Sequence, residues 1–192
     1  MPDTDAPENL RALIVDDERE VADAYALRLR GYCDIETAYG GAEALSVVEN
    51  SAIDIVLLDR YMPDMSGDEV LRELDERGYY GRVVMVTAVD PDFDVLEMPF
   101  DDYLCKPVDR ADVRAVIDQQ RRVLAYETLG EYFGAESKRA VVEAETTPEE
   151  RRSHERYLAV ARRAATLERR ARRLLDDDAA LDEFDSIGRE EM

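Results

Sequence analysis

The chain has 192 residues, which is enough for one domain of ordinary size and a smaller appendage. It has 46 acidic and 25 basic residues, for a net charge of −21, and only Lys106 and Lys138 are lysines. Such an excess repels itself in dilute salt but is screened at molar salt, where the Debye length falls to about 3 Å. The composition therefore indicates a halophilic protein. A basic partner would explain the charge less well, because the acidic residues are spread over most of the chain.

Several functional classes are excluded by what the sequence lacks. No stretch approaches the ~20 apolar residues of a membrane span, and the acidic N-terminus does not resemble a signal peptide, so we expect a cytoplasmic protein without a membrane partner. Cys33 and Cys105 have no metal-ligand or redox spacing. The single histidine, His154, stands among arginines and glutamates, which argues against most histidine-based catalysis.

The first two thirds of the chain alternate between short apolar runs and segments of helical periodicity. Strands are predicted at 10–15, 35–39, 53–58, 83–86 and 103–105, and helices around 21–29, 44–48, 70–74 and 109–124. This alternation with short loops predicts a doubly wound α/β fold with a five-stranded parallel sheet, over residues 10–125.

From residue 126 onward the pattern is helical. Residues 126–145 are predicted to be a helix whose start is uncertain because of Gly130 and Gly134. Thr147-Pro148-Glu149-Glu150 is a helix-start signal, with a capping hydroxyl, a proline at the first position and a glutamate three residues after the cap. We expect the next helix to run to about Leu175, so that 126–192 forms a helical output or dimerisation region.

Apolar residues recur every seven positions in that last helix. They form two series, Tyr157, Ala164 and Ala171, and Val160, Leu167 and Leu174. This spacing favours a coiled-coil seam and a weak homodimer through the C-terminal helix. The alternative is that the same face packs on residues 10–125 or on the 126–145 helix.

Five polar residues stand at predicted strand ends, although they are far apart in the sequence. They are Asp16, Asp17, Asp59, Thr87 and Lys106. The carboxyl ends of parallel strands converge on one crevice, so these side chains should meet there. Neighbouring carboxylates repel by about 4 kcal/mol per pair at ~4 Å and an effective dielectric near 20, which a divalent cation would offset. An all-oxygen site suits Mg²⁺.

The predicted site suits phosphoryl transfer to a carboxylate. Asp59 can attack a phosphoryl group directly, giving an acyl phosphate, and needs no general base because it is already ionised. The Lys106 ammonium and Mg²⁺ would neutralise the phosphoryl oxygens, and the Thr87 hydroxyl would donate to one of them.

Residues 10–125 resemble a response regulator receiver domain. The resemblance rests on four segments, 13–18 (Leu-Ile-Val-Asp-Asp-Glu), 55–67 (which contains Asp59 and Met62-Pro63), 84–88 (which contains Thr87) and 102–107 (which ends in Lys106-Pro107). It implies a flavodoxin-like strand order 2-1-3-4-5 and a histidine kinase as phosphodonor. It also implies that Asp17, Asp59 and the backbone carbonyl of Tyr61 bind Mg²⁺, with Asp16 assisting through water. Thr87 and Tyr103 are implied to move together on phosphorylation, with the aromatic ring turning inward.

Two further features qualify the resemblance. Residues 88–100 contain two prolines and leave room for only a short fourth helix, in a region where receivers form their activated dimer face. Residues 126–192 are similar to the HalX family, a helical region that follows receivers in haloarchaea. The protein would be a switch that catalyses only its own phosphorylation and dephosphorylation, and not an enzyme acting on other substrates.

Other classes fit less well. A phosphatase of the haloacid dehalogenase type would have a second aspartate two residues after the nucleophile, where this chain has Tyr61. A dinucleotide-binding domain would have a glycine-rich turn where this chain has Asp16-Asp17-Glu18, which repels pyrophosphate. A DNA-binding transcriptional regulator remains the alternative, because residues 151–173 contain nine arginines and two glutamates. It is not favoured, because the arginines surround an apolar seam and are followed by Asp176-Asp177-Asp178.

The net charge of −21 predicts a strong dependence of stability on salt. The melting temperature should rise markedly between about 0.1 and 2 M KCl, because screening relieves repulsion that exposed ion pairs, worth ~0–1 kcal/mol each, cannot offset. Circular dichroism melts over this range test it, and a flat or falling melting temperature would contradict the halophilic interpretation.

Overall fold

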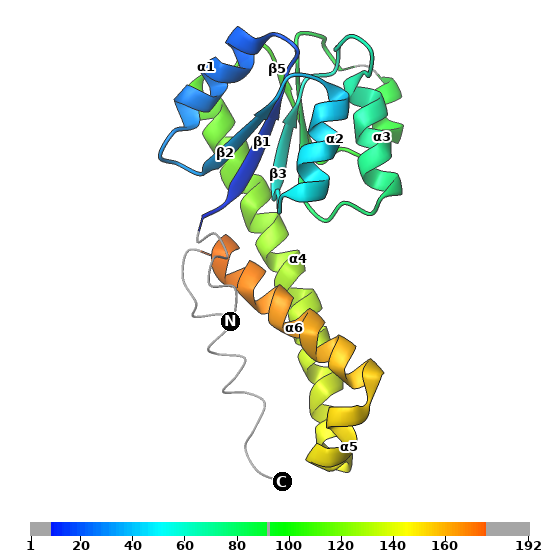
Figure 1. Ribbon diagram of the computed structural model, residues 1–192. Helices are drawn as coiled ribbons and strands as arrows, with labels where there is room; N and C mark the ends of the chain where they lie inside the picture. The colour runs from blue at the N-terminus through cyan, green and yellow to red at the C-terminus, as the bar shows by residue number, and fades with distance from the viewer. Residues whose placement is uncertain (1–8, 92, 176–192) are drawn as a thin grey trace. The chain divides into compact units, whose positions relative to one another are not determined.

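The computed structural model describes residues 9–91 and 93–175 (Figure 1). Two compact units make up the chain: the first is Asn9–Arg121, and the second begins at Arg122. The first unit contains all five strands, and the second is helical.

A five-stranded parallel sheet forms the centre of the first unit. Its strands are β1 (Arg11–Val15), β2 (Asp34–Ala38), β3 (Ile55–Leu58), β4 (Arg82–Thr87) and β5 (Asp102–Cys105). Their spatial order is β2-β1-β3-β4-β5, and every pair is parallel. The order reverses direction at β1, so a crevice is expected where the loops after β1 and β3 diverge. The predicted fold is confirmed, including its strand order.

Helices cover both faces of this sheet (Figure 1). They are α1 (Arg19–Leu29), α2 (Gly41–Asn50), α3 (Gly67–Glu76) and the first turns of α4 (Arg110–Glu145). Because side chains alternate along a strand, Leu13, Val56 and Met85 share one face, where they pack against α2 and α3. Tyr32, which follows α1, donates a hydrogen bond to Asp118 of α4 on the other side.

The segment between β4 and β5 has little regular structure. Among its described residues it contains only a 3-10 helix, η1 (Phe93–Glu97), where Phe93 and Leu96 are 89% and 79% exposed. The absence of a full helix between these strands agrees with the two prolines of the sequence.

The second unit is built from the later part of α4 with α5 (Pro148–Ser153) and α6 (Glu155–Leu174). The predicted capping box is present, since the Thr147 hydroxyl accepts from the Glu150 N–H and the Glu150 carboxylate accepts from the Thr147 N–H. The helix after it is not continuous to Leu175 as predicted. It breaks at His154, whose Nδ1 accepts the N–H of Tyr157 and so begins a new helix.

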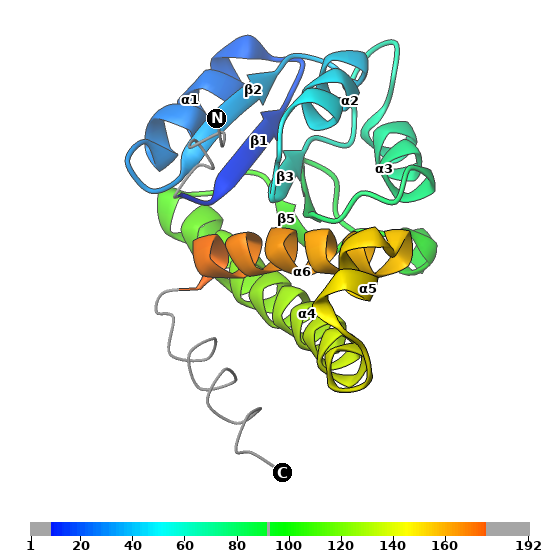
Figure 2. The ribbon, with the colours of Figure 1, turned by 60° about the horizontal axis from the view of Figure 1, so that its bottom comes forward.

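The heptad seam of α6 is buried within the chain. Ala164 and Ala171 are fully buried and pack against Leu129, Tyr132 and Ala135 of α4. Figures 1 and 2 both show α6 lying along α4. The interpretation of this seam as a contact between two chains is therefore corrected, because the seam joins two helices of one chain. This packing is the alternative that the spacing left open.

Candidate functional site

Four of the predicted site residues lie at the carboxyl ends of the strands. Asp16 follows β1, Asp59 follows β3, Thr87 ends β4 and Lys106 follows β5. Asp16, Asp59 and Thr87 are only 3%, 8% and 1% exposed. The backbone N–H of Asp59 donates to the Val15 carbonyl at 2.9 Å, which continues the β1–β3 pairing to Asp59.

Lys106 joins the two buried carboxylates. Its Nζ lies 2.7 Å from Oδ2 of Asp16 and 2.9 Å from Oδ1 of Asp59. The remaining oxygen of each carboxylate accepts a backbone N–H, from Glu18 to Asp16 at 3.0 Å and from Tyr61 to Asp59 at 3.1 Å. Each carboxylate is thus held by one ammonium contact and one backbone contact, which fixes its orientation.

The electrostatics of the site oppose ionisation of Asp59. The pKa of Asp59 lies above its ordinary value, and burial is the largest cause. The nearby Lys106 acts to lower this pKa, and the nearby Asp16 acts to raise it. Burial also acts against the charge of Lys106, but hydrogen bonds to Asp16 and Asp59 hold the pKa of the ammonium above its ordinary value. The lysine is therefore charged at neutral pH and supplies the positive charge that the buried carboxylates need.

The loop after β3 approaches Asp59 closely. A Cβ at Gly67 would lie 2.2 Å from the carbonyl oxygen of Asp59, so no larger residue fits without moving the backbone. The Gly67 N–H donates to the Arg60 carbonyl at 2.8 Å, which ties the start of α3 to the residue after Asp59. This close approach explains why the 55–67 segment has a glycine at position 67, although glycine has no side chain that could take part in the reaction.

The predicted metal ligands are brought together only in part. Asp16 and Asp59 share Lys106, and the Tyr61 backbone lies beside Asp59, while the Tyr61 side chain is exposed. Asp17 is only partly buried. Within residues 9–91 and 93–175, no three acidic, histidine or cysteine side chains converge as metal ligands. The donors are all oxygens, and two carboxylates lie close together, which suits Mg²⁺ by kind.

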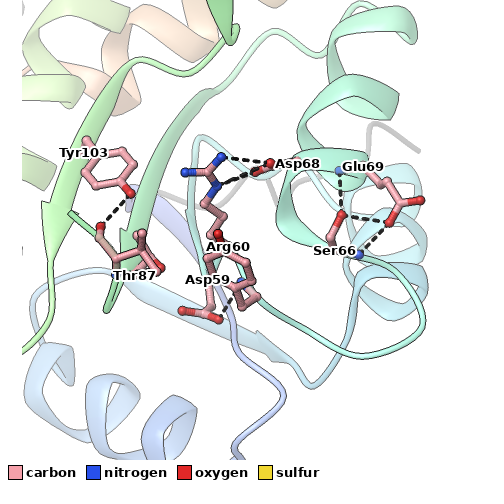
Figure 3. A network of polar contacts seen from close by, with 9 residues as sticks. Asp59, Arg60, Ser66, Asp68, Glu69, Thr87 and Tyr103 are labelled. Carbon is pink, nitrogen blue, oxygen red and sulfur yellow. Dashed lines mark hydrogen bonds and ion pairs between the residues drawn. The ribbon is translucent and has the colours of Figure 1, made fainter. Parts of the chain in front are cut away.

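Tyr103 on β5 is partly buried and packs against the core of the first unit, with its hydroxyl directed at the loop after β4 (Figure 3). Its hydroxyl donates to the carbonyl of Val89 at 2.8 Å, and its ring lies 5.6 Å from that of Phe100. The Val89 N–H in turn lies 3.5 Å from the Thr87 hydroxyl oxygen. Thr87 and Tyr103, which the resemblance pairs, are therefore linked here through one residue.

One ion pair beside Asp59 was not predicted from the sequence. Arg60 directly follows Asp59, and its guanidinium contacts both oxygens of Asp68 at 3.0–3.3 Å (Figure 3). The only sequence signal is a single arginine beside the acceptor in an acidic loop, which does not say which acid it binds.

Comparison with known proteins agrees with this geometry. Residues 12–118 match the response regulator receiver domain, and residues 122–188 match the HalX domain. The chain belongs to the response regulator receiver family. In this receiver Asp16, Asp59, Thr87 and Lys106 lie at the carboxyl ends of their strands. No helix in the described ranges combines the length and apolarity needed to cross a membrane.

Curated relatives carry regulator names. A candidate transcriptional regulator of Haloferax volcanii is 44% identical over 139 residues, covering 71% of this chain and 24% of that protein. The alkaline phosphatase synthesis transcriptional regulatory protein PhoP of Bacillus subtilis is 37% identical over 112 residues, 56% of this chain and 46% of PhoP. This chain thus spans between about a quarter and a half of the length of these relatives.

Solved structures show the same receiver fold. A CheY-like receiver domain protein of Methanospirillum hungatei has a TM-score of 0.58 at 27% identity, covering 62% of this chain and 98% of that one. The BeF3-activated receiver domain of DrrB, a protein of Thermotoga maritima, has a TM-score of 0.53 at 26% identity, covering 58% of this chain and 96% of that one.

The position of Lys106 predicts the effect of removing its charge. Lys106→Met should lower the free energy of unfolding at neutral pH by on the order of 3 kcal/mol, because two buried carboxylates lose their counter-charge. The pKa of Asp59, already raised, should rise further. The deficit should shrink as the pH falls through that pKa, since a protonated Asp59 needs no counter-charge.

Carboxyl-carbon NMR titration and denaturant unfolding measure the two effects. Lys138→Met is the matched control, because Lys138 is the only other lysine and is exposed. An unchanged pKa of Asp59 in the Lys106→Met protein would refute this view of the site.

Proposed function

We propose that this protein is the response regulator of a two-component phosphorelay that accepts a phosphoryl group on Asp59 from a histidine kinase. The observation that supports the proposal is the Lys106 ammonium, which lies within 2.9 Å of both Asp16 and Asp59. A carboxylate with a purely structural role would gain no stability from a second buried carboxylate beside it. An acceptor with a cation next to its reacting oxygen is suited to receive a dianionic group.

The chemistry follows from the contacts of Asp59. An oxygen of the carboxylate attacks phosphorus, the bond from phosphorus to the kinase histidine nitrogen breaks, and the nitrogen keeps the electron pair. The product is an acyl phosphate. Lys106 then neutralises a phosphoryl oxygen, and the buried Thr87 hydroxyl donates to another. Burial of Asp59 excludes much of the water that would hydrolyse the product.

Mg²⁺ is proposed as the cofactor. Asp17, Asp59 and the Tyr61 carbonyl would hold it, with Asp16 assisting through water. When bound, the ion would supply positive charge that offsets the carboxylates and the phosphoryl oxygens. The oxygen-only donors and the burial that raises the pKa of Asp59 are consistent with a site that gains from added positive charge.

The output is proposed to pass through the C-terminal helices. Thr87 moves toward the phosphoryl group, Tyr103 turns inward, and the changed surface acts on the helical region after residue 125. The 36-residue helix α4 supports this route, because it begins in the receiver and continues into the HalX domain without a break. The weak homodimer expected from the heptad spacing is not part of the proposal, since α4 occupies its seam. The protein is a cytoplasmic switch that catalyses only its own phosphorylation and dephosphorylation.

Phosphorylation is tested with acetyl phosphate and Mg²⁺. The protein should gain one phosphoryl group that is labile at alkaline pH, and Asp59→Asn should abolish the gain because it removes the nucleophile. Asp64→Asn is the control, because Asp64 is an exposed carboxylate in the same loop, and its φ of 64° suits asparagine. Undiminished labelling of the Asp59→Asn protein, followed by intact mass, would refute the assignment.

Direct DNA binding through residues 151–173 is the second candidate. Arg152, Arg156 and Arg162 are exposed, which favours it. Other arginines are engaged within the chain, such as Arg163 with Glu131 at 2.8 Å and Arg172 with Glu168 at 3.0 Å. The acids expected to neutralise the helix, Asp176–Asp178, lie outside the described residues. The regulator names of relatives lend limited support to DNA binding by this chain, because PhoP matches over only 46% of its length.

Fluorescence anisotropy with duplex DNA separates the two candidates. An affinity for DNA that falls steeply between about 50 and 200 mM salt is the signature of phosphate neutralisation. We expect the protein not to show such an affinity. If such an affinity is found, and replacing Arg152, Arg156 and Arg162 by Gln removes it, DNA binding replaces the proposed output through protein contacts.

A further inference from the structure

A cavity of about 270 Å³ lies in the second unit, at the corner where α5 connects α4 to α6 (Figure 1). Val142 of α4 and Tyr157 and Val160 of α6 line it, and carbon atoms form nearly all of its wall. Its volume lies just below the range of drug-sized ligand sites. An apolar cavity offers water few hydrogen bonds, whereas small apolar molecules bind in such cavities. The cavity is therefore suited to a ring-sized apolar group.

Polar contacts around the cavity hold its shape. The Arg151 guanidinium donates to the carbonyl of Glu143 at 3.1 Å and to the carbonyl of Thr146, which joins α5 to the last turn of α4. Arg139 pairs with the Glu143 carboxylate at 3.2 Å, and the Tyr157 hydroxyl donates to the same carboxylate, which joins α4 to α6. Arg139 and Arg151 are therefore engaged in the frame of the cavity.

Lys138 and Arg156 give the cavity a positive edge. Both line it and are exposed, and within residues 9–91 and 93–175 neither forms a hydrogen bond or an ion pair. Long basic side chains commonly lay their stems on apolar surface and keep their charged ends in water. The carboxylate that lines the cavity, that of Glu150, is engaged in the capping box of α5. Two cations are thus left for a ligand, in a chain whose net charge is −21.

We propose that this cavity binds a small organic anion with a ring-sized apolar body and one carboxylate. The apolar body fills the cavity, and the carboxylate accepts hydrogen bonds from Lys138 and Arg156 at its edge. A neutral ligand would leave both cations unused, and an organic cation would be repelled by them. Salt screens a contact pair beside an apolar wall less than it screens distant exposed charges, so the site also works at high salt.

The location of the site separates it from the proposed phosphorylation of Asp59. All of its lining residues lie between Lys138 and Val160, within the HalX match and outside the unit that contains Asp59. The second unit is then a ligand-binding module, and its ligand is a second input to the protein beside the phosphoryl group.

Benzoate, added to the full chain, is a probe with the proposed chemistry. Titration followed by NMR should shift the methyl signals of Val142 and Val160, because both residues line the cavity. Benzamide is the matched neutral probe, and it should bind about tenfold more weakly, because a charge-assisted hydrogen bond is stronger than a neutral one. Benzoate that leaves both valines unshifted, or equal affinities for benzoate and benzamide, would overturn the proposal.

Removal of each charge tests the two cations separately. Lys138→Met and Arg156→Met keep an apolar stem without the charge, so each should weaken benzoate binding by about threefold and leave benzamide binding unchanged. Arg152→Met is the control, because Arg152 is also exposed but is not one of the residues that line the cavity. If both variants bind benzoate as tightly as the wild type, the role given to the cations is wrong.

A larger side chain in the wall tests the place of binding. Val142→Phe adds a ring beside the cavity and should abolish the binding of both probes. The helix should tolerate the change, because Val142 is 39% exposed, and circular dichroism checks this. Val141→Phe is the control, because the neighbouring Val141 is 69% exposed and does not line the cavity. Undiminished benzoate binding in a folded Val142→Phe protein would place the ligand elsewhere and refute the site.

Two other occupants of the cavity would be detected without a probe. In the free protein, NMR contacts between Val142 and the ring of Phe184 would show that the chain's own C-terminal segment fills the cavity. Methyl shifts of Val142 that change with protein concentration would show that a second copy fills it. We expect neither result, and either one would contradict a site for a small organic anion.

Discussion

The contact of one ammonium with two buried carboxylates is the interaction on which the site depends. Asp16 and Asp59 repel each other, and burial strengthens that repulsion, so Lys106 stabilises the crevice by lying between them. Their positions follow from the parallel sheet, which brings the ends of β1, β3 and β5 to one edge. In the proposed reaction the lysine that stabilises the free site also receives a phosphoryl oxygen, so stability and reactivity would have the same origin.

The fold and the centre of the site could be predicted because both follow from local patterns. Apolar runs define the strands. The parallel sheet then brings the polar residues at the ends of these runs to one edge: Asp16, Asp59, Thr87 and Lys106. The partner of Arg60 could not be predicted, because several acids lie within reach in the loop and the fold of 63–68 selects Asp68. The position of the Tyr103 hydroxyl depends on a hydrogen bond to the Val89 carbonyl that no spacing in the sequence reveals.

The C-terminal region shows the limit of periodicity. Heptad spacing predicts an apolar stripe, but it does not say which helix covers it. In the structure α4 continues through Gly130 and Gly134 to Glu145 and supplies Leu129, Tyr132 and Ala135, so α6 packs within its own chain. The small residues Ala164 and Ala171 allow this close approach. A seam with alanine at two of its positions is adequate for two helices already tethered by a short connection, because tethering removes most of the entropic cost of association.

The central claim is that Asp59, and not another carboxylate of the acidic crevice, forms the acyl phosphate. Borohydride reduction after treatment with acetyl phosphate and Mg²⁺ converts a phosphorylated aspartate to homoserine, which peptide mass spectrometry locates. We expect homoserine at position 59 only when phosphodonor and Mg²⁺ are both present. Homoserine at position 16 or 17, or an unmodified chain under these conditions, would contradict it.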